Sequence, residues 1–306
     1  MYDKIVLVTR QTRLEALIKK FNTLGQAKFY IEHSGGDFKR YLLEHENYMK
    51  SLTQLQQILK PLARVQQIER HYLPNFLFGE SDIVVTLGID GLVVNVAKYL
   101  TGQPLIAVNP DPQNIDGPLL PFTVAQASSA IKNVLQGRAK IQKISMIEAT
   151  LNDGQKLLAF NDLFIGRHDH ISAHYKIMYH GRSEYHSSSG IIISTGIGST
   201  GWMSSIFNMT NGIIQTFGSG CKLNPPHLPR TSHQLLFVVR EPFISKTTDA
   251  SIVCGILTDD SQLTITSTMP EGGVIFSDGV LNDFLAFDAG TTAKIGLAKQ
   301  KVHLVN

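Results

Sequence analysis

Asp90 lies between Gly88 and Gly91, a few residues after the apolar run Ile83–Val85 and before an apolar segment of helical character. A strand, glycine turn and helix start in this order offer unpaired backbone N–H groups and the positive end of a helix dipole to an anion. A carboxylate beside a phosphate is repelled unless it holds a metal ion or accepts a proton from an attacking hydroxyl. The same residues also suit an aspartate that merely caps the helix. The segment therefore predicts either a phosphotransfer centre or a capped turn.

A second segment rich in glycine and hydroxyl groups runs from Gly196 to Trp202 and matches the pattern G-x-G-x-x-G. The dinucleotide fingerprint of that form needs an acidic residue about 20 positions later to bind ribose hydroxyls. No Asp or Glu occurs between Gly201 and Glu241, so we expect a turn of another kind, able to seat phosphate or sugar hydroxyls. Trp202, the only tryptophan, could stack on a base or pack in the core at a helix start. A Walker A loop is excluded because the chain has no Gly-Lys dipeptide.

Two groups of basic or imidazole side chains leave alternatives open. His168, His170 and His174 could ligate a metal from one face of a strand, or simply face solvent at its end. The basic residues of a long helical stretch suit its solvent-exposed side or a dock for a polyanion. These residues are Lys39, Arg40, Lys60 and Arg64.

The first third of the chain alternates strand and helix patterns. Strands are predicted at Lys4–Arg10, at Lys28–Glu32, from Asp82 and at Pro104–Val108. Helices are predicted at Leu14–Leu24 and over residues 38–67, the latter interrupted by Pro61. Such repeated units predict a doubly wound parallel sheet, which binds ligands beyond the carboxyl ends of its strands. Asp90 and the run Asn109–Asp111 both lie at that edge.

The character of the sequence changes after a helix predicted at Thr123–Leu135. Short strand-like runs then alternate with turn residues, such as Asn152-Asp153-Gly154, which is a strong hairpin signal. We therefore predict an α/β domain over residues 1–122 and a β-rich, sandwich-like domain over 123–306, whose last residues can return to the first domain. A cleft between two such domains is the default site for a ligand.

Composition limits the classes of function. With 306 residues, 43% hydrophobic and 17% charged, the chain is an ordinary globular protein with room for two domains. The net charge of +3 is too small and too dispersed for a nucleic-acid interface, and no apolar run is long enough to cross a membrane. A strand already begins at Lys4, and Cys221 and Cys254 form no CxxC pair. We therefore expect a cytoplasmic protein without a leader peptide or a disulfide.

Three segments, in order, resemble the NAD kinase family. GIDGL at 88–92 resembles the family's GGDGT loop, AFNDLFI with Asn161 and Asp162 resembles its Asn-Glu pair, and SGIIISTGIGSTGW at 189–202 resembles its DG-hydrophobic-STPTGSTAY run. NPDP at 109–112, followed by Gly117, resembles the mitochondrial-type branch, and Ser277-Asp278-Gly279 resembles the family's last Asp-Gly turn. The similarity covers roughly residues 80 to 290.

The resemblance implies transfer of a phosphate from ATP or polyphosphate to the 2′-hydroxyl of the adenosine ribose of NAD, in a homodimer or homotetramer. Asp90 would be the general base, and Mg²⁺ would lie between the phosphates and the acids, with no residue assigned as its ligand. The implied substrate-binding residues are Gly88, Gly91, Asn161, Asp162, Ser194, Thr195, Gly198, Ser199, Thr200 and Trp202. The implied nucleotide-side residues are Asn109, Asp111, Gly117 and Asp278.

The sequence also departs from the family pattern. Ile89 and Leu92 replace a glycine and a threonine, which predicts a crowded approach for phosphate and the loss of a hydroxyl donor. Ser189 replaces an aspartate that contacts the nicotinamide end. Two alternatives to an NAD kinase therefore stay open at this point. One is a weak or inactive NAD- or NADP-binding protein, and the other is a kinase of the same superfamily that acts on a lipid or sugar hydroxyl.

Overall fold

The computed structural model describes residues 2–218, 222–226, 228–280 and 283–306. The chain forms two compact units, Met1–Gln142 with Val302–Asn306, and Lys143–Lys301. The division falls later than Thr123 because helix α5 (Ala127–Leu135) packs its buried face into the core of the first unit.

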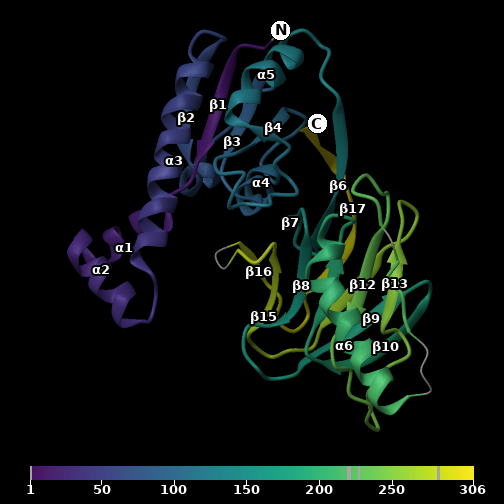
Figure 1. Ribbon diagram of the computed structural model, residues 1–306. Coiled ribbons are helices and arrows are strands. Elements are labelled where there is room, and N and C mark those ends of the chain that lie inside the picture. The colour runs from purple at the N-terminus through teal and green to yellow at the C-terminus, as the bar shows by residue number, and fades with distance from the viewer. Residues whose placement is uncertain (1, 219–221, 227, 281–282) are drawn as a thin grey trace. The chain divides into compact units, whose positions relative to one another are not determined.

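The first unit is built on a parallel sheet (Figure 1). Its strands in spatial order are β2 (Arg64–Glu69), β1 (Lys4–Thr9), β3 (Asp82–Leu87) and β4 (Pro104–Asn109). Two further segments run parallel to β4, namely β5 (Phe122–Thr123) and the last residues of β17 (Thr292–Val305). Every residue of β3 and β4 is buried, as their uninterrupted apolar sequences predict for a sheet covered on both faces.

Helices cover both faces of this sheet, which confirms the doubly wound architecture. Helices α3 (Phe38–Leu59) and α5 share one apolar cluster with alternate residues of the strands, such as Ile5, Val85 and Ile106. Helix α4 (Asp90–Ala97) packs against β3 with its own buried apolar residues, which lie outside that cluster. Two shorter helices, α1 (Arg13–Phe21) and α2 (Leu24–His33), pack against each other and against α3. A 3₁₀ turn, η1 (Arg70–Asn75), follows β2.

Two predictions for the first unit were wrong. Lys28–Glu32 lies inside α2 rather than in a strand, because Thr23 caps the helix by accepting a hydrogen bond from the Gln26 backbone. The helix predicted over 38–67 ends at Leu59, and Arg64–Glu69 forms β2. Among the described residues that strand pairs with β1 alone and buries little besides Ile68, so its sequence carries almost no strand pattern of its own.

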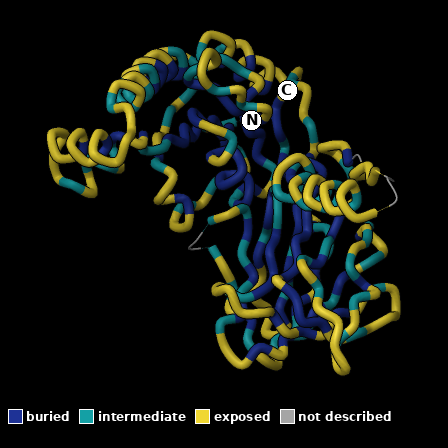
Figure 2. The backbone as a smooth tube through the Cα atoms, turned by 60° about the horizontal axis from the view of Figure 1, so that its bottom comes forward, coloured by how far each residue is buried: buried dark blue, intermediate teal, exposed yellow. Residues whose placement is uncertain are grey.

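The second unit is a β-sandwich, as predicted. Its first sheet contains β10 (Arg182–Ser188), β9 (Ala173–Tyr179), β14 (Leu263–Ser267), β17, β6 (Ile141–Leu151) and β7 (Lys156–Ala159). Its second sheet has the order β13 (Cys254–Leu257), β12 (Leu235–Val239), β11 (Ile191–Ser194), β8 (Asp162–Arg167), β15 (Gly273–Ser277) and β16 (Phe284–Ala286). One apolar cluster joins the sheets, with Tyr175 and Ile265 from the first and Ile193 and Phe237 from the second. The buried strands are dark blue in Figure 2.

Local turn chemistry explains the hairpins of this unit. The predicted hairpin at Asn152–Gly154 joins β6 to β7, and Gly154 has a φ of 91°. His180 and Gly181, with φ of 48° and 74°, join β9 to β10, which the sequence had not indicated as a strand. A 3₁₀ turn, η3 (Gly198–Thr200), leads into α6 (Trp202–Phe217).

Two further predictions concern the chain as a whole. Cys254 is an exposed free thiol, whereas Cys221 lies outside the described residues. Within the described ranges, no helix is both long and apolar enough to cross a membrane.

Candidate functional site

Asp90 is the first residue of α4, directly beyond the carboxyl end of β3. The N-cap position belongs to Ile89, whose side chain makes no capping hydrogen bond, so Asp90 is not the helix cap. Asp90 Oδ1 instead accepts a hydrogen bond from the Leu119 backbone N–H at 2.9 Å. This bond fixes the carboxylate to the loop that follows β4. A half-buried carboxylate that a backbone donor orients is suited to accept a proton from a nearby hydroxyl.

The two glycines around Asp90 have different reasons to be glycine. A Cβ on Gly88 would lie 2.8 Å from Leu92 Cδ2, so a side chain there would displace the side chain of Leu92. A Cβ on Gly91 would meet nothing within 4 Å, so protein packing does not require glycine at that position. Open space beside the first turn of a helix is where a phosphate could approach.

The two departures from the family motif also differ in position. Ile89 is 42% exposed, and its side chain lines a cavity of the first unit. Leu92 is 1% exposed and packs under Gly88. Ile89 is thus exposed at this cavity, and the narrowing of the approach for phosphate by its side chain stays a prediction. The side chain of Leu92 is buried, and the expected loss of a hydroxyl donor at this position stays a prediction.

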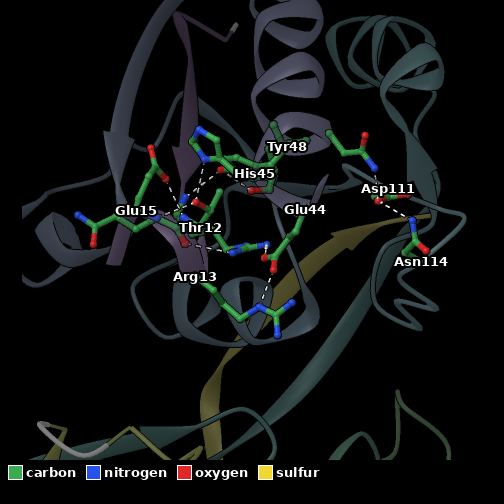
Figure 3. Close-up of polar contacts among 12 residues, drawn as sticks. Thr12, Arg13, Glu15, Glu44, His45, Tyr48, Asp111 and Asn114 are labelled. Atoms are coloured by element: carbon green, nitrogen blue, oxygen red, sulfur yellow. Dashed lines mark hydrogen bonds and ion pairs between the residues drawn. The ribbon is translucent and has the colours of Figure 1, made fainter. Parts of the chain in front are cut away.

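The loop after β4 is ordered by side-chain amides and a carboxylate. Asn109 Nδ2 donates to Ile115 O at 2.9 Å, and Asn109 Oδ1 accepts from the Asp111 backbone at 2.9 Å. Asp111 Oδ2 accepts from Asn114 and from Asn47 of α3, at 2.9 Å in each case (Figure 3). Gly117 has a φ of 47°, which favours glycine. The loop is thus held firmly beside the end of β4, and Asp111 also lines the cavity that Ile89 reaches.

In the second unit, Asn161 and Asp162 are positioned by a distant carboxylate. Asp278 Oδ1 accepts hydrogen bonds from the backbone N–H groups of Phe160, Asn161 and Asp162 at 3.1, 2.6 and 3.2 Å. Asp278 has a φ of 54°, in a turn where an aspartate tolerates that conformation. The carboxylate of Asp278 therefore binds the backbone of residues 160–162. Asp278 is thus a residue that positions Asn161 and Asp162.

The glycine and hydroxyl run contacts the same loop from the other side. Thr195 Oγ1 donates to Phe160 O at 2.7 Å, and the Thr195 backbone donates to Asn161 O at 3.0 Å. A Cβ on Gly198 would lie 2.2 Å from Asn161 O, so this close approach requires glycine. Residues from β8, β11 and the β15–β16 turn thus meet around two polar side chains.

Each of these two side chains, Asn161 and Asp162, has one buried oxygen that accepts no hydrogen bond from the described residues. Asn161 Oδ1 and Asp162 Oδ1 are both buried, and neither has a hydrogen-bond partner among the described residues. Burial, aided by the negative charge of Asp278, raises the pKa of Asp162 to about 7, against the opposing effect of a hydrogen bond from Ser194. A buried acceptor left unpaired costs about 1 to 3 kcal/mol. A ligand that brought hydroxyl donors would remove that cost.

The remaining predicted residues form the start of α6. Ser199 Oγ donates to Gly196 O at 2.7 Å and Thr200 Oγ1 to Ile197 O at 3.3 Å, so both hydroxyls already stabilise the turn as donors. The Trp202 ring stacks on Phe164, with centroids 5.7 Å apart and planes within 11°. The Arg240 guanidinium carbon lies 5.5 Å from the centre of the Trp202 ring. A nucleotide base that stacked on the Trp202 ring would therefore lie beside Phe164 and Arg240.

A pocket of about 440 Å³ opens at this aromatic group, within the second unit. Its lining includes Trp202, Phe164, Phe276, Arg240 and Ser189. Sequence reasoning had not singled out Arg240 or Phe164. Arg240 directly follows β12, the neighbour of β11, so the pairing of these strands brings it to Trp202. The lining also contains Arg167, which is paired with Asp169. Aromatic faces beside a guanidinium group suit a flat, anionic or amide-bearing ligand group.

The predicted site residues therefore fall into two sets, each brought together within one unit. The first unit holds Gly88, Asp90, Gly91, Asn109, Asp111 and Gly117, and the second holds Asn161, Asp162, Ser194, Thr195, Gly198, Ser199, Thr200, Trp202 and Asp278. In the part of the chain that the structure describes, no three His, Cys, Asp or Glu side chains are grouped to hold a metal ion. His168 instead has Nδ1 3.0 Å from Gly272 O.

Comparison with known proteins gives similar sequences and folds. No protein-family model matches the chain. A probable NADH kinase of Oryza sativa subsp. japonica is 24% identical over 220 residues, which are 64% of this chain and 62% of that protein. An NAD kinase of Caldanaerobacter subterraneus subsp. tengcongensis is 27% identical over 173 residues, 53% of this chain and 57% of its own length. The chain thus spans about six tenths of the length of these relatives.

Two solved structures share the fold over nearly the whole chain. Yeast NADH kinase complexed with NADH superposes with a TM-score of 0.60 and 16% identity, covering 100% of this chain and 84% of that one. An NAD kinase from Archaeoglobus fulgidus in complex with ATP gives a TM-score of 0.57 and 14% identity, with coverage of 99% and 93%.

Proposed function

We propose that this protein, which has the fold of the NAD kinases and resembles them in sequence, transfers a phosphate from ATP or polyphosphate to the 2′-hydroxyl of the adenosine ribose of NAD, giving NADP. In the reaction the hydroxyl oxygen forms a bond to the terminal phosphorus, and the bond from that phosphorus to its bridging oxygen breaks. The hydroxyl proton passes to a carboxylate. The shortened donor leaves as the diphosphate or the shorter chain.

The observation that carries this proposal is the pair of unpaired acceptors, Asn161 Oδ1 and Asp162 Oδ1. A ribose ring presents hydroxyl donors, and a buried site built to hydrogen-bond hydroxyls discriminates strongly against ligands without them. The backbone around the pair is fixed by Asp278 and Thr195 before any ligand arrives. Such preorganisation lowers the entropic cost of binding.

Asp90 is the proposed general base. Its place at the start of α4, beyond the carboxyl end of a buried parallel strand, is where doubly wound folds bind their ligands. The hydrogen bond from Leu119 orients one carboxylate oxygen. The open space at Gly91 leaves room for a phosphate near the first helical turn, where the helix dipole favours negative charge.

Mg²⁺ fits this arrangement only as an ion that arrives with the phosphates. Among the described residues there is no cage of three ligating side chains, and Mg²⁺ commonly uses one or two carboxylates together with substrate phosphates. Asp90 follows β3 and Asp111 follows β4, so both carboxylates lie beyond the carboxyl ends of these two strands. When bound, the ion would neutralise charge on the phosphate chain.

The test is formation of NADP by the purified protein with Mg²⁺, NAD and either ATP or polyphosphate, with NADH assayed in parallel. Asp90→Asn keeps the size of the side chain but removes the proton acceptor, so turnover should fall by about 10²- to 10⁴-fold. NAD affinity measured by calorimetry should change little. An Asp90→Asn variant as active as the parent would refute the assignment of the base. A parent that binds NAD without producing NADP would instead be a dinucleotide-binding protein.

We also propose that the protein assembles as a homodimer or homotetramer, as its family resemblance implies. Met209, Ile213 and Phe217 support this, since they are exposed and spaced four residues apart along one face of α6. Light scattering of the purified protein measures its mass directly.

A further inference from the structure

The first unit contains a cavity of about 600 Å³ that is lined by three arginines. Arg10 follows β1, Arg13 begins α1, and Arg40 lies in the first turns of α3. Ile89 and Asp111 line the same cavity. The three arginines and the loop that carries Asp90 therefore line the same cavity.

The lining of this cavity carries three arginines and two carboxylates, Glu44 and Asp111, so one positive charge is in excess. Glu44 binds two of the arginines at once, with Oε1 accepting from Arg10 Nη2 at 3.1 Å and Oε2 accepting from Arg13 Nε (Figure 3). The Arg40 side chain is exposed and lies 3.7 Å from Asp37. Two guanidinium groups that share one carboxylate leave a net positive charge, and guanidinium groups bind phosphate oxygens in bidentate geometry.

Arg10 is the fixed member of the group. Its side chain is 12% exposed, and its guanidinium carbon lies 5.0 Å from the centre of the Tyr48 ring. Its Nε is buried and has no hydrogen-bond partner among the described residues. Its other two guanidinium nitrogens donate to Gln11 O and to Glu44. A buried donor without an acceptor costs free energy, which an anion that reached Nε would reduce.

Arg10 also connects the cavity to the proposed catalytic loop. Its Cδ would lie 3.6 Å from a Cβ placed on Gly88, and Ile89 separates Gly88 from Asp90 in the chain. An anion bound by Arg10 and Arg13 would therefore lie next to the loop that holds the base. Asp111 offers one carboxylate, already held by two amides, to a Mg²⁺ ion that such an anion would bring.

We infer that Arg10, Arg13 and Arg40 bind the linear phosphate chain of the donor, which is the chemistry common to ATP and inorganic polyphosphate. This inference deepens the proposed function and rests on it for the identity of the donor. The three guanidinium groups supply N–H donors to phosphate oxygens in the cavity that Ile89 also lines. The recognised feature is a chain of phosphates, and the cavity needs no base to bind it.

Calorimetry with sodium tripolyphosphate and Mg²⁺, in the absence of NAD, tests this directly. The variant is Arg13→Gln, whose parent side chain is 60% exposed and can be replaced without opening the core. The matched control is Arg138→Gln, which removes the same charge from an exposed position in the same unit. We expect Arg13→Gln to weaken tripolyphosphate binding by about tenfold or more, as the loss of a charge-assisted bidentate contact implies. The control should bind like the parent.

Kinetic and competition measurements separate the two donor sources. If the shared phosphate chain is recognised, ATP displaces tripolyphosphate, and Arg13→Gln raises the KM for both donors while the KM for NAD stays unchanged. Binding of ATP without binding of tripolyphosphate would overturn the inference, as would an equal loss in Arg138→Gln or no loss in Arg13→Gln. Arg13-dependent binding without NADP formation would support the inference while the proposed function failed. NADP formation with an unchanged donor KM in Arg13→Gln would support the proposed function and overturn the inference about the arginines.

Discussion

Replacing Asp162 by asparagine should remove a loss of stability that the second unit of the parent protein suffers as the pH rises. In the native structure burial raises the pKa of this carboxyl to about 7, against an ordinary value of 3.8. Between these two values the folded chain holds a proton that the unfolded chain has released. Stability is therefore fully present below about pH 4 and is lost as the pH rises through 7.

The size of the effect follows from the pKa difference. Each pH unit inside this window removes about 1.4 kcal/mol from the free energy of unfolding, and the whole window removes up to about 4 kcal/mol. Asparagine keeps the shape of the side chain but has no proton to lose. The stability of Asp162→Asn relative to the parent should thus increase by about 2 kcal/mol between pH 5 and pH 7.

Urea unfolding followed by tryptophan fluorescence is a suitable assay. Trp202 is the only tryptophan and lies in the second unit, so its signal reports the unit that contains Asp162. Asp260→Asn, an exposed aspartate of the same unit, is the control and should follow the parent at every pH. A difference between Asp162→Asn and the parent that stays constant from pH 5 to pH 8 would refute the idea that burial destabilises the ionised carboxylate.

Ile89→Gly should lower the donor KM and change the melting temperature little, because the side chain is partly exposed and glycine is a good N-cap; an unchanged or raised KM would mean that Ile89 does not narrow the approach. Leu92→Thr should destabilise the first unit by about 2 to 3 kcal/mol in urea, since it removes buried apolar surface and buries a hydroxyl. Trp202→Ala should weaken NAD binding by about 1 to 3 kcal/mol if a base stacks there, whereas a lower melting temperature with unchanged affinity would show packing on Phe164 alone. Gly198→Ala should lower both the melting temperature and NAD affinity, because its Cβ would collide with Asn161 O; wild-type behaviour would contradict that contact.

Local sequence was sufficient wherever neighbouring residues alone decide the structure. The buried run before Asp90, the glycine turn and the helix after it were predicted because strand and helix patterns with a glycine between them are a local property. The Asp-Gly hairpin between β6 and β7 was predicted for the same reason, since the turn needs positive φ. The ordered motifs also identified the NAD kinase resemblance, which the sequence and fold comparisons confirm.

The tertiary structure decided what depends on partners far away in the chain. β2 is a strand because β1 pairs with it, although its own residues show little alternation. Leu92 turned out to be a core residue because Gly88 packs on it. Asp278 binds backbone N–H groups of residues 160–162, a contact that no local pattern records. Arg10 and Arg13 became part of a cavity only when β1, α1 and α3 converged, because side chains from separate elements acquire a common environment only through packing.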